Sequence, residues 1–91
     1  MGNSRPKPER LAEKLRQIRE ALGLSQTEML KRLGLDESMS YARISEYETG
    51  QREPSLLTLL AYSRAAGVHM EVLADDGKEL PAKLPGRDNL R

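Results

Sequence analysis

The stretch LSQTEMLKRLGLDESMSYARISEYETG, residues 24–50, decides the fold that we expect for this chain. Ser25 and Glu28 have the spacing of a capping box, in which each side chain satisfies a free backbone amide at the start of a helix. Gly34 ends this helix because glycine adopts the left-handed conformation of a C-cap without strain. A polar connection then leads into a second helix, expected over residues 41–49. The stretch therefore predicts two short helices joined by a turn.

The flanking sequence predicts three more helices. Over residues 9–22 apolar side chains recur every three or four positions, which places them on one helix face: Leu11, Leu15, Ile18 and Leu22. A further helix is expected over residues 56–66, between an N-cap at Ser55 and a stop at Gly67. Its residues at helical spacing are Leu56, Leu59, Leu60 and Ser63. A final helical turn is expected over residues 70–73.

Five short helices over residues 9–74 predict one compact all-α domain. Residues 1–8 precede it as a polar, basic flexible arm with two prolines, which is either a plain terminus or an arm that reaches DNA phosphates. Residues 75–91 have no helical period and contain prolines and glycines. We therefore expect them to form a C-terminal tail or dimerisation arm rather than part of the core.

Composition excludes several classes of function. The net charge is only +1, with +4 in residues 1–35 and −3 in residues 36–50, which gives little support for nucleic-acid binding. Cysteine is absent and His69 is the single histidine, so we expect no metal site and no cofactor. We find no nucleophile–base pair and expect no enzyme. No apolar run approaches the roughly 18 residues of a membrane span, so a cytoplasmic protein without a membrane partner is expected.

Several short motifs together resemble a known family. They are Gly23-Leu-Ser-Gln26, the Gly34 stop, Ile44-Ser-x-Tyr-Glu48 followed by Gly50, Pro54-Ser55 and Gly67-Val68. Over roughly residues 10–74 they resemble the lambda-repressor/Cro-like helix-turn-helix domain, the Xre family. The resemblance implies a five-helix fold in a bacterial or phage-like protein that binds double-stranded operator DNA as a homodimer and represses transcription. One helix then braces on the DNA backbone and the next lies in the major groove.

The resemblance assigns roles to the bracing helix and to one scaffold pair. It places Gln26 at a phosphate, where its amide can donate a hydrogen bond beside the partly positive helix N-terminus. An ordinary exposed glutamine is the alternative. It also pairs Arg19 with Glu48, which would tie the first helix to the third and remove Glu48 from the repulsion at the DNA face.

The recognition helix is expected to turn Ile44, Tyr47 and Glu48 toward the scaffold. That leaves a DNA-facing set of Tyr41, Ala42, Arg43, Ser45, Glu46 and Thr49, with Arg52 following as a phosphate contact. Arg43 can bridge guanine O6 and N7 or hold a phosphate, and Ser45 can donate or accept at either. Tyr41 and Ala42 can contact a thymine methyl group. Glu46 can accept from cytosine N4, can act as a filter against wrong sites, or is only a solvated charge.

Two features depart from the family pattern. Ile44 follows Gly34 by ten positions, whereas the family usually has about six. About four residues are therefore inserted in the turn, and they include Asp36 and Glu37. Leu30 occupies a position where the family favours alanine because the two helices cross closely there. We expect the longer turn to make room for the leucine.

A dimer surface and a second function remain open from the sequence. Leu57 and Val72 lie where the family usually has polar, exposed residues. Together with Ala61, Leu80 and Leu84 they could form one apolar patch. Such a patch either binds a second copy or is covered by the tail within one chain. The alternative to a DNA-binding regulator is an antitoxin or protein-interaction module that uses residues 74–91 to bind a protein partner such as a toxin.

Overall fold

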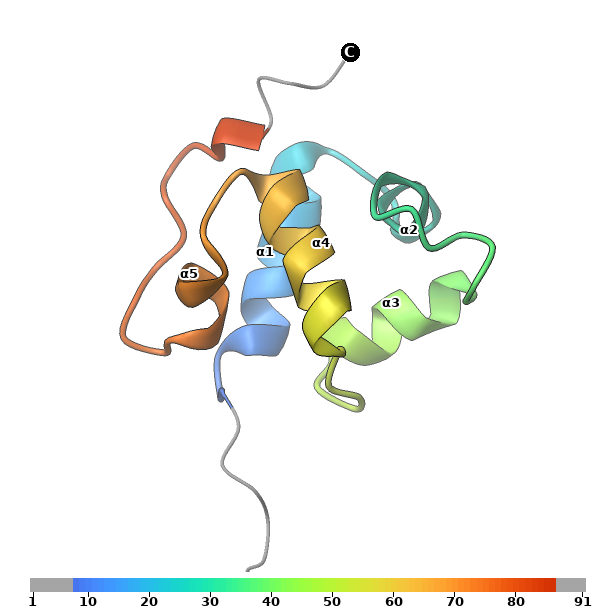
Figure 1. Ribbon diagram of the computed structural model, residues 1–91, viewed down its shortest axis with the longest axis horizontal. Helices are drawn as coiled ribbons and strands as arrows, with labels where there is room; N and C mark the ends of the chain where they lie inside the picture. Colours follow the sequence, from blue (N-terminus) through green and yellow to red (C-terminus); the bar gives the residue numbers. More distant parts are fainter. Residues whose placement is uncertain (1–7, 87–91) are drawn as a thin grey trace, which may run out of the picture.

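The computed structural model describes residues 8–86, which form five helices. They are α1 Leu11–Leu22, α2 Gln26–Arg32, α3 Tyr41–Glu48, α4 Leu56–Ala66 and α5 Met70–Ala74. The described range contains no strand, and the expected all-α, five-helix fold is confirmed. In Figure 1, α2 and α3 lie together on the right, and α5 lies on the opposite side of α1 and α4. The expected basic arm lies outside the described residues, except for Pro8.

The core sits where α1 meets the other helices. α1 packs against α3, α4 and α5, and α2 packs against α3. The buried apolar side chains are Leu11, Leu15, Ile18, Leu22, Met29, Leu30, Leu33, Ile44, Tyr47, Tyr62, Ala66, Leu73 and Leu84. The apolar face predicted for the first helix is therefore confirmed, and so is the burial of Ile44 and Tyr47.

The insertion between α2 and α3 forms an ordered turn. At the end of α2, Gly34 has φ 77°. Its N–H donates to Lys31 O at 2.9 Å, and Leu35 N–H donates to Leu30 O at 3.1 Å, which is the Schellman arrangement. The chain then turns once more, because Met39 N–H donates to Leu35 O at 3.1 Å. Leu35 and Met39 pack against the core at the two ends of this turn.

The side chains at the tip of that turn point to solvent. Asp36 and Glu37 are exposed, and below them the Tyr47 hydroxyl donates to Met39 Sδ at 3.8 Å. Leu30 is buried at only 4% exposure. The longer turn thus accompanies a fully packed leucine between α2 and α3, and it presents two acidic groups just before α3.

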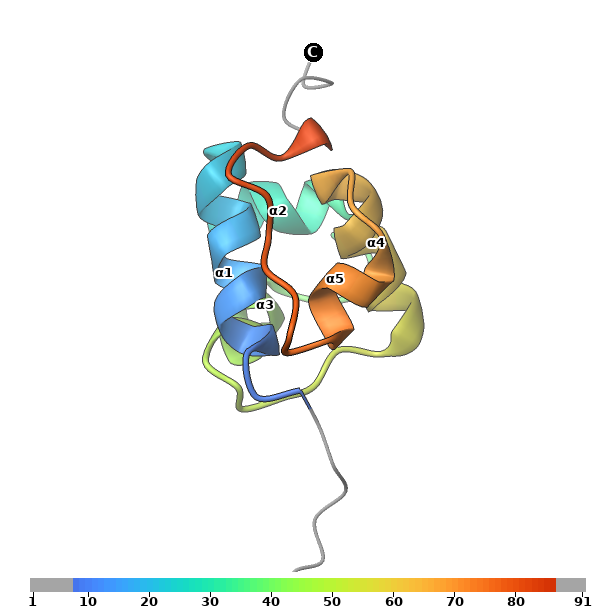
Figure 2. The same cartoon turned by 90° about the vertical axis from the view of Figure 1, so that its left-hand side faces the viewer.

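The segment after α5 is packed on the core, which corrects the expected tail for residues 75–86. Figure 2 shows this segment running lengthwise between α1 and the pair α4 and α5. Leu84 is only 4% exposed and belongs to the core, and Leu80 packs against it. Gly86 lies so close to α4 that an added Cβ would overlap the carbonyl oxygen of Ala65. Leu84 therefore cannot be part of an exposed dimer patch.

Reciprocal hydrogen bonds fasten this segment to α1. The Asp76 carboxylate accepts from the backbone amides of Glu9 and Arg10 at 2.9 and 3.0 Å, just before α1 begins. Lys14 Nζ in turn donates to the carbonyls of Val72 and Asp75, both at 2.8 Å. Each element thus satisfies backbone groups that the other leaves free at its end.

Lys14 lies outside the apolar positions predicted for the first helix, and yet it is buried. The side chain is 1% exposed, and burial lowers its pKa. A buried ammonium is tolerated here because the two carbonyls replace part of its hydration. Sequence periodicity could not reveal this, since the two acceptors lie about 60 residues further along the chain.

The buried face of α4 does not follow the four residues at helical spacing. Leu56 is one of those four, yet it is 70% exposed, and Leu57 beside it is 75% exposed. The buried residues of α4 are Thr58, Tyr62, Ser63 and Ala66. Leucines occupy four of the first five positions of α4 and therefore lie on several sides of the helix. Their pattern alone does not predict which side is buried.

Candidate nucleic-acid interface

The exposed face of α3 carries the side chains that the sequence assigned to DNA. Ile44 and Tyr47 are buried at 0% and 3% exposure, which fixes the rotation of the helix. Consequently the remaining side chains lie on the outer side: Tyr41, Ala42, Arg43, Ser45, Glu46 and Thr49. Tyr41, Ala42 and Thr49 are exposed, and Arg43, Ser45 and Glu46 are half-buried. All six side chains of the set are therefore at least partly accessible to solvent.

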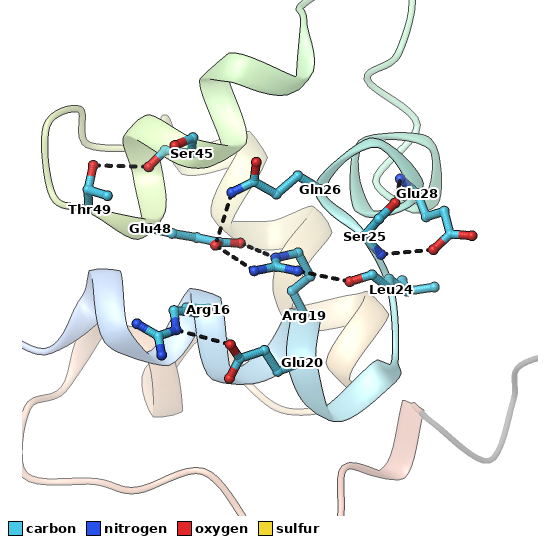
Figure 3. Close-up of polar contacts among 10 residues, drawn as sticks. All are labelled: Arg16, Arg19, Glu20, Leu24, Ser25, Gln26, Glu28, Ser45, Glu48 and Thr49. Atoms are coloured by element: carbon cyan, nitrogen blue, oxygen red, sulfur yellow. Dashed lines mark hydrogen bonds and ion pairs between the residues drawn. The ribbon is translucent and has the colours of Figure 1, made fainter.

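Arg19 and Glu48 join α1 to the end of α3, as Figure 3 shows. Arg19 Nε donates to Glu48 Oε2 at 2.6 Å, and Nη2 donates to Oε1 at 3.1 Å. The Glu48 side chain is 4% exposed and that of Arg19 is 17% exposed. The hydrogen bonds to Glu48 raise the pKa of Arg19. This two-point contact orients α3 on the scaffold and keeps the Glu48 charge away from the outer face.

Gln26 extends the same network to α2. Its side-chain amide donates to Glu48 Oε1 at 3.4 Å, while Arg19 Nη1 donates to the carbonyl of Leu24 at 3.0 Å. The start of α2 is fixed by the predicted capping box: Glu28 N–H donates to Ser25 Oγ at 3.1 Å, and Ser25 N–H donates to Glu28 Oε1 at 2.8 Å. The Glu48 carboxylate in α3 thus accepts hydrogen bonds from α1 and from α2, and it links the three helices.

Two arginines of the expected DNA-facing set converge on Glu46. Arg52 Nε donates to Glu46 Oε1 at 2.9 Å, and Arg43 Nε lies 3.4 Å from the same oxygen. The i, i+3 spacing of Arg43 and Glu46 was visible in the sequence. The approach of Arg52 was not, because it requires the chain to fold back after α3 at Gly50, where φ is 80°.

Thr49 has a local partner that the sequence did not indicate. Its hydroxyl donates to Ser45 O at 3.0 Å, at the end of α3. The hydroxyl proton is therefore engaged with the helix, and Thr49 offers an outside partner its oxygen lone pairs. Arg52 lies beyond the helix end and is exposed, on the same side as Glu46.

The arrangement can present donors and acceptors to the edges of base pairs. A helix face with one arginine, one carboxylate and small hydroxyl side chains has the chemical groups that read the major groove. Within residues 8–86 no helix is long and apolar enough to cross a bilayer. The same residues hold no group of three or more side chains suited to binding a metal ion.

Comparison with protein-family models gives a match to a helix-turn-helix model that covers residues 15–73. Searches of curated proteins and of solved structures gave no significant match. The matched range takes in α2, the lengthened turn and α3, together with most of α1, α4 and α5. The chain therefore belongs to the lambda-repressor-like, or Xre-type, helix-turn-helix family of DNA-binding transcription regulators.

Proposed function

We propose that this chain binds double-stranded DNA in a sequence-specific manner, as a symmetric dimer, and that it represses transcription. The observation that supports this most is the outer face of α3, which buried Ile44 and Tyr47 and the Arg19–Glu48 pair hold in one orientation. A recognition helix needs such fixation, because base readout depends on donors and acceptors placed to within fractions of an ångström.

The side chains divide into readers and positioners. Arg43, Ser45 and Glu46 lie on the outer face of α3 and read base edges. Gln26 at the start of α2 contacts a phosphate, for which it exchanges its 3.4 Å hydrogen bond to Glu48. Phosphate contacts fix the register on the duplex and carry no base information of their own.

The dimer surface that we propose lies at the start of α4. Leu57, expected in such a patch, is exposed, and Leu56 next to it adds a second exposed leucine. Ala61, Val72 and Leu80 are half-buried and contribute less. Because α4 begins soon after α3, pairing of two copies here sets the spacing of two recognition helices, which must lie roughly 34 Å apart on one face of DNA.

Selection of duplexes from a randomised library tests the function. Recovery of a palindromic site, bound with an affinity that falls steeply with salt, is the expected result. Arg43→Ala should then cost about 1–3 kcal/mol and relax the preference at one base pair. Arg64→Ala, an exposed position in the last turn of α4, is the matched charge control and should leave the preference unchanged. Failure to enrich any sequence at low salt, with the fold intact, would contradict the proposal.

The dimer is tested separately by light scattering. Leu56→Ser with Leu57→Ser should convert a dimer to a monomer without lowering the free energy of unfolding of the monomer, because both side chains are already exposed in it. DNA affinity should fall as well, since each half-site is then bound independently. A wild-type chain that is monomeric both free and on DNA would contradict the dimer.

A further inference from the structure

Glu46 holds both arginines of the DNA-facing surface at once. Its Oε1 atom accepts from Arg52 Nε at 2.9 Å and lies 3.4 Å from Arg43 Nε. Its backbone carbonyl also accepts the amides of Gln51 and Arg52, at 2.9 and 3.2 Å. The loop after α3 is thereby folded back over this one residue, which places two guanidinium groups against a single carboxylate.

The three side chains remain within reach of DNA. The exposed fraction is 36% for the side chains of Arg43 and Glu46 and 51% for that of Arg52. Only the Nε atom of each arginine meets Glu46, so an arginine that contacts a phosphate or a guanine through its other N–H groups divides its charge between Glu46 and the DNA. The two arginines then neutralise the negative charge of Glu46 less completely than in the free protein. The carboxylate repels the nearby phosphates, and this repulsion opposes binding.

How strongly the repulsion between Glu46 and the phosphates opposes binding depends on the DNA sequence. On a duplex that offers no donor at this position, nothing offsets the repulsion of Glu46. Where a cytosine amino group faces Glu46, the carboxylate accepts a hydrogen bond and the repulsion is offset. The penalty therefore falls mainly on wrong sites, which is discrimination by an unfavourable contact.

Resting on the DNA-binding function proposed above, we infer that Glu46 is a specificity-determining residue: it restrains Arg43 and Arg52 in the free protein and weakens binding to non-cognate DNA more than binding to the cognate site. The carboxylate lowers the total affinity and raises the ratio between right and wrong sequences.

The test compares Glu46→Gln with Glu37→Gln, each in the full chain. Both remove one negative charge, but Glu37 is exposed in the turn before α3, whereas Glu46 is the carboxylate that pairs with the two arginines. Fluorescence anisotropy measures binding to the library-selected duplex and to a scrambled duplex over a range of KCl concentrations. Glu46→Gln should tighten binding to the scrambled duplex about three- to tenfold, and should steepen its dependence on salt by about one ion.

The ratio of the two affinities decides the outcome. Glu46→Gln should lower it at least about threefold, whereas Glu37→Gln should shift both duplexes equally. An equal shift in both variants would overturn this inference and leave the proposed function standing, while a wild-type chain that binds neither duplex would remove both. A readout without DNA is the Nε–H NMR signals of Arg43 and Arg52, which should move in Glu46→Gln. Unmoved signals would also overturn the inference.

Discussion

Arg19 and Glu48 form the contact on which the orientation of the recognition helix depends. Two hydrogen bonds, 2.6 and 3.1 Å long, connect the guanidinium group of Arg19 in α1 to the carboxylate of Glu48 at the end of α3. Both side chains are largely shielded from water. Loss of one partner leaves the other with an uncompensated charge in a poorly solvated place, which costs more than the intact pair contributes.

Glu48→Gln should therefore lower the free energy of unfolding by about 2–4 kcal/mol, because the variant leaves Arg19 without a counter-charge. Urea unfolding followed by circular dichroism gives the value. Glu20→Gln is the matched control, since Glu20 pairs with Arg16 at 3.1 Å but both side chains are more than half exposed. Its cost should stay below about 0.5 kcal/mol. Equal costs for the two variants would contradict the role given to burial.

Local signals predicted the helices well. Ser25 and Gly34 predicted the start and the end of α2, and Ser55 and Gly67 predicted those of α4. Caps and left-handed glycines can be recognised from the sequence because they act over a single turn of chain. The partnership of Arg19 with Glu48 came from resemblance rather than from periodicity. Neither source could give the placement of residues 75–86, because that segment has no period and its contacts lie far back along the sequence.

The candidate site was predictable in its outline and not in its internal contacts. The outward set on α3 follows from the burial of Ile44 and Tyr47, which a helical period implies. The approach of Arg52 to Glu46 depends on the path of a loop. The burial of Lys14 could not be predicted for a related reason: the carbonyls that allow a lysine to be buried belong to α5 and to the residue after it.

The docking of the C-terminal segment is tested by Gly67→Ala. Gly67 ends α4 with φ 76°, and a Cβ there would stand 2.5 Å from the backbone nitrogen of Gly86. The variant combines backbone strain with this overlap, so it should lose about 1–3 kcal/mol more than strain alone would cost. Thermal and urea unfolding measure the loss.

Gly23→Ala supplies the control for backbone strain. Gly23 ends α1 with φ 74°, and an added Cβ there meets nothing within 4 Å. It should cost about 1–2 kcal/mol, the price of the left-handed conformation for a residue with a side chain. If both alanines cost the same, the segment that ends at Gly86 is not held against α4 in solution.

Asp76 should make stability depend on acid pH. Backbone hydrogen bonds from Glu9 and Arg10 lower its pKa below the ordinary value of 3.8. A carboxyl group with a lowered pKa in the folded state stabilises the fold above its unfolded pKa, and this contribution disappears as pH falls through the folded pKa. The wild type should therefore exceed Asp76→Asn in stability at pH 7, and the difference should shrink below about pH 4.

Urea midpoints at pH 7, 4 and 2.5 measure that difference. Asp36→Asn, in the exposed turn before α3, is the control, because it removes a surface carboxylate that does not accept the backbone amides before α1. A difference between wild type and Asp76→Asn that stays constant down to pH 2.5 would show that the carboxylate does not cap the start of α1.

Tyr62 combines full burial with a hydroxyl that has no hydrogen-bond partner among the described residues. Removing an unsatisfied buried hydroxyl relieves a desolvation cost, so Tyr62→Phe should leave the free energy of unfolding unchanged or raise it by up to about 1–2 kcal/mol. Tyr47→Phe is the matched control, because the Tyr47 hydroxyl donates to Met39 Sδ and its loss should be neutral or slightly destabilising.

Measurements at alkaline pH show whether the buried hydroxyl of Tyr62 causes the difference in stability between Tyr62→Phe and the wild type. Burial raises the pKa of Tyr62 above its ordinary value of 10.0. A tyrosine with a raised pKa in the folded state contributes its stability below the unfolded pKa and loses it as pH rises beyond that value. The advantage of Tyr62→Phe over the wild type should therefore grow between pH 9 and about pH 11 in paired urea titrations. A Tyr62→Phe variant less stable than the wild type at pH 7 would mean that the hydroxyl finds a partner in solution.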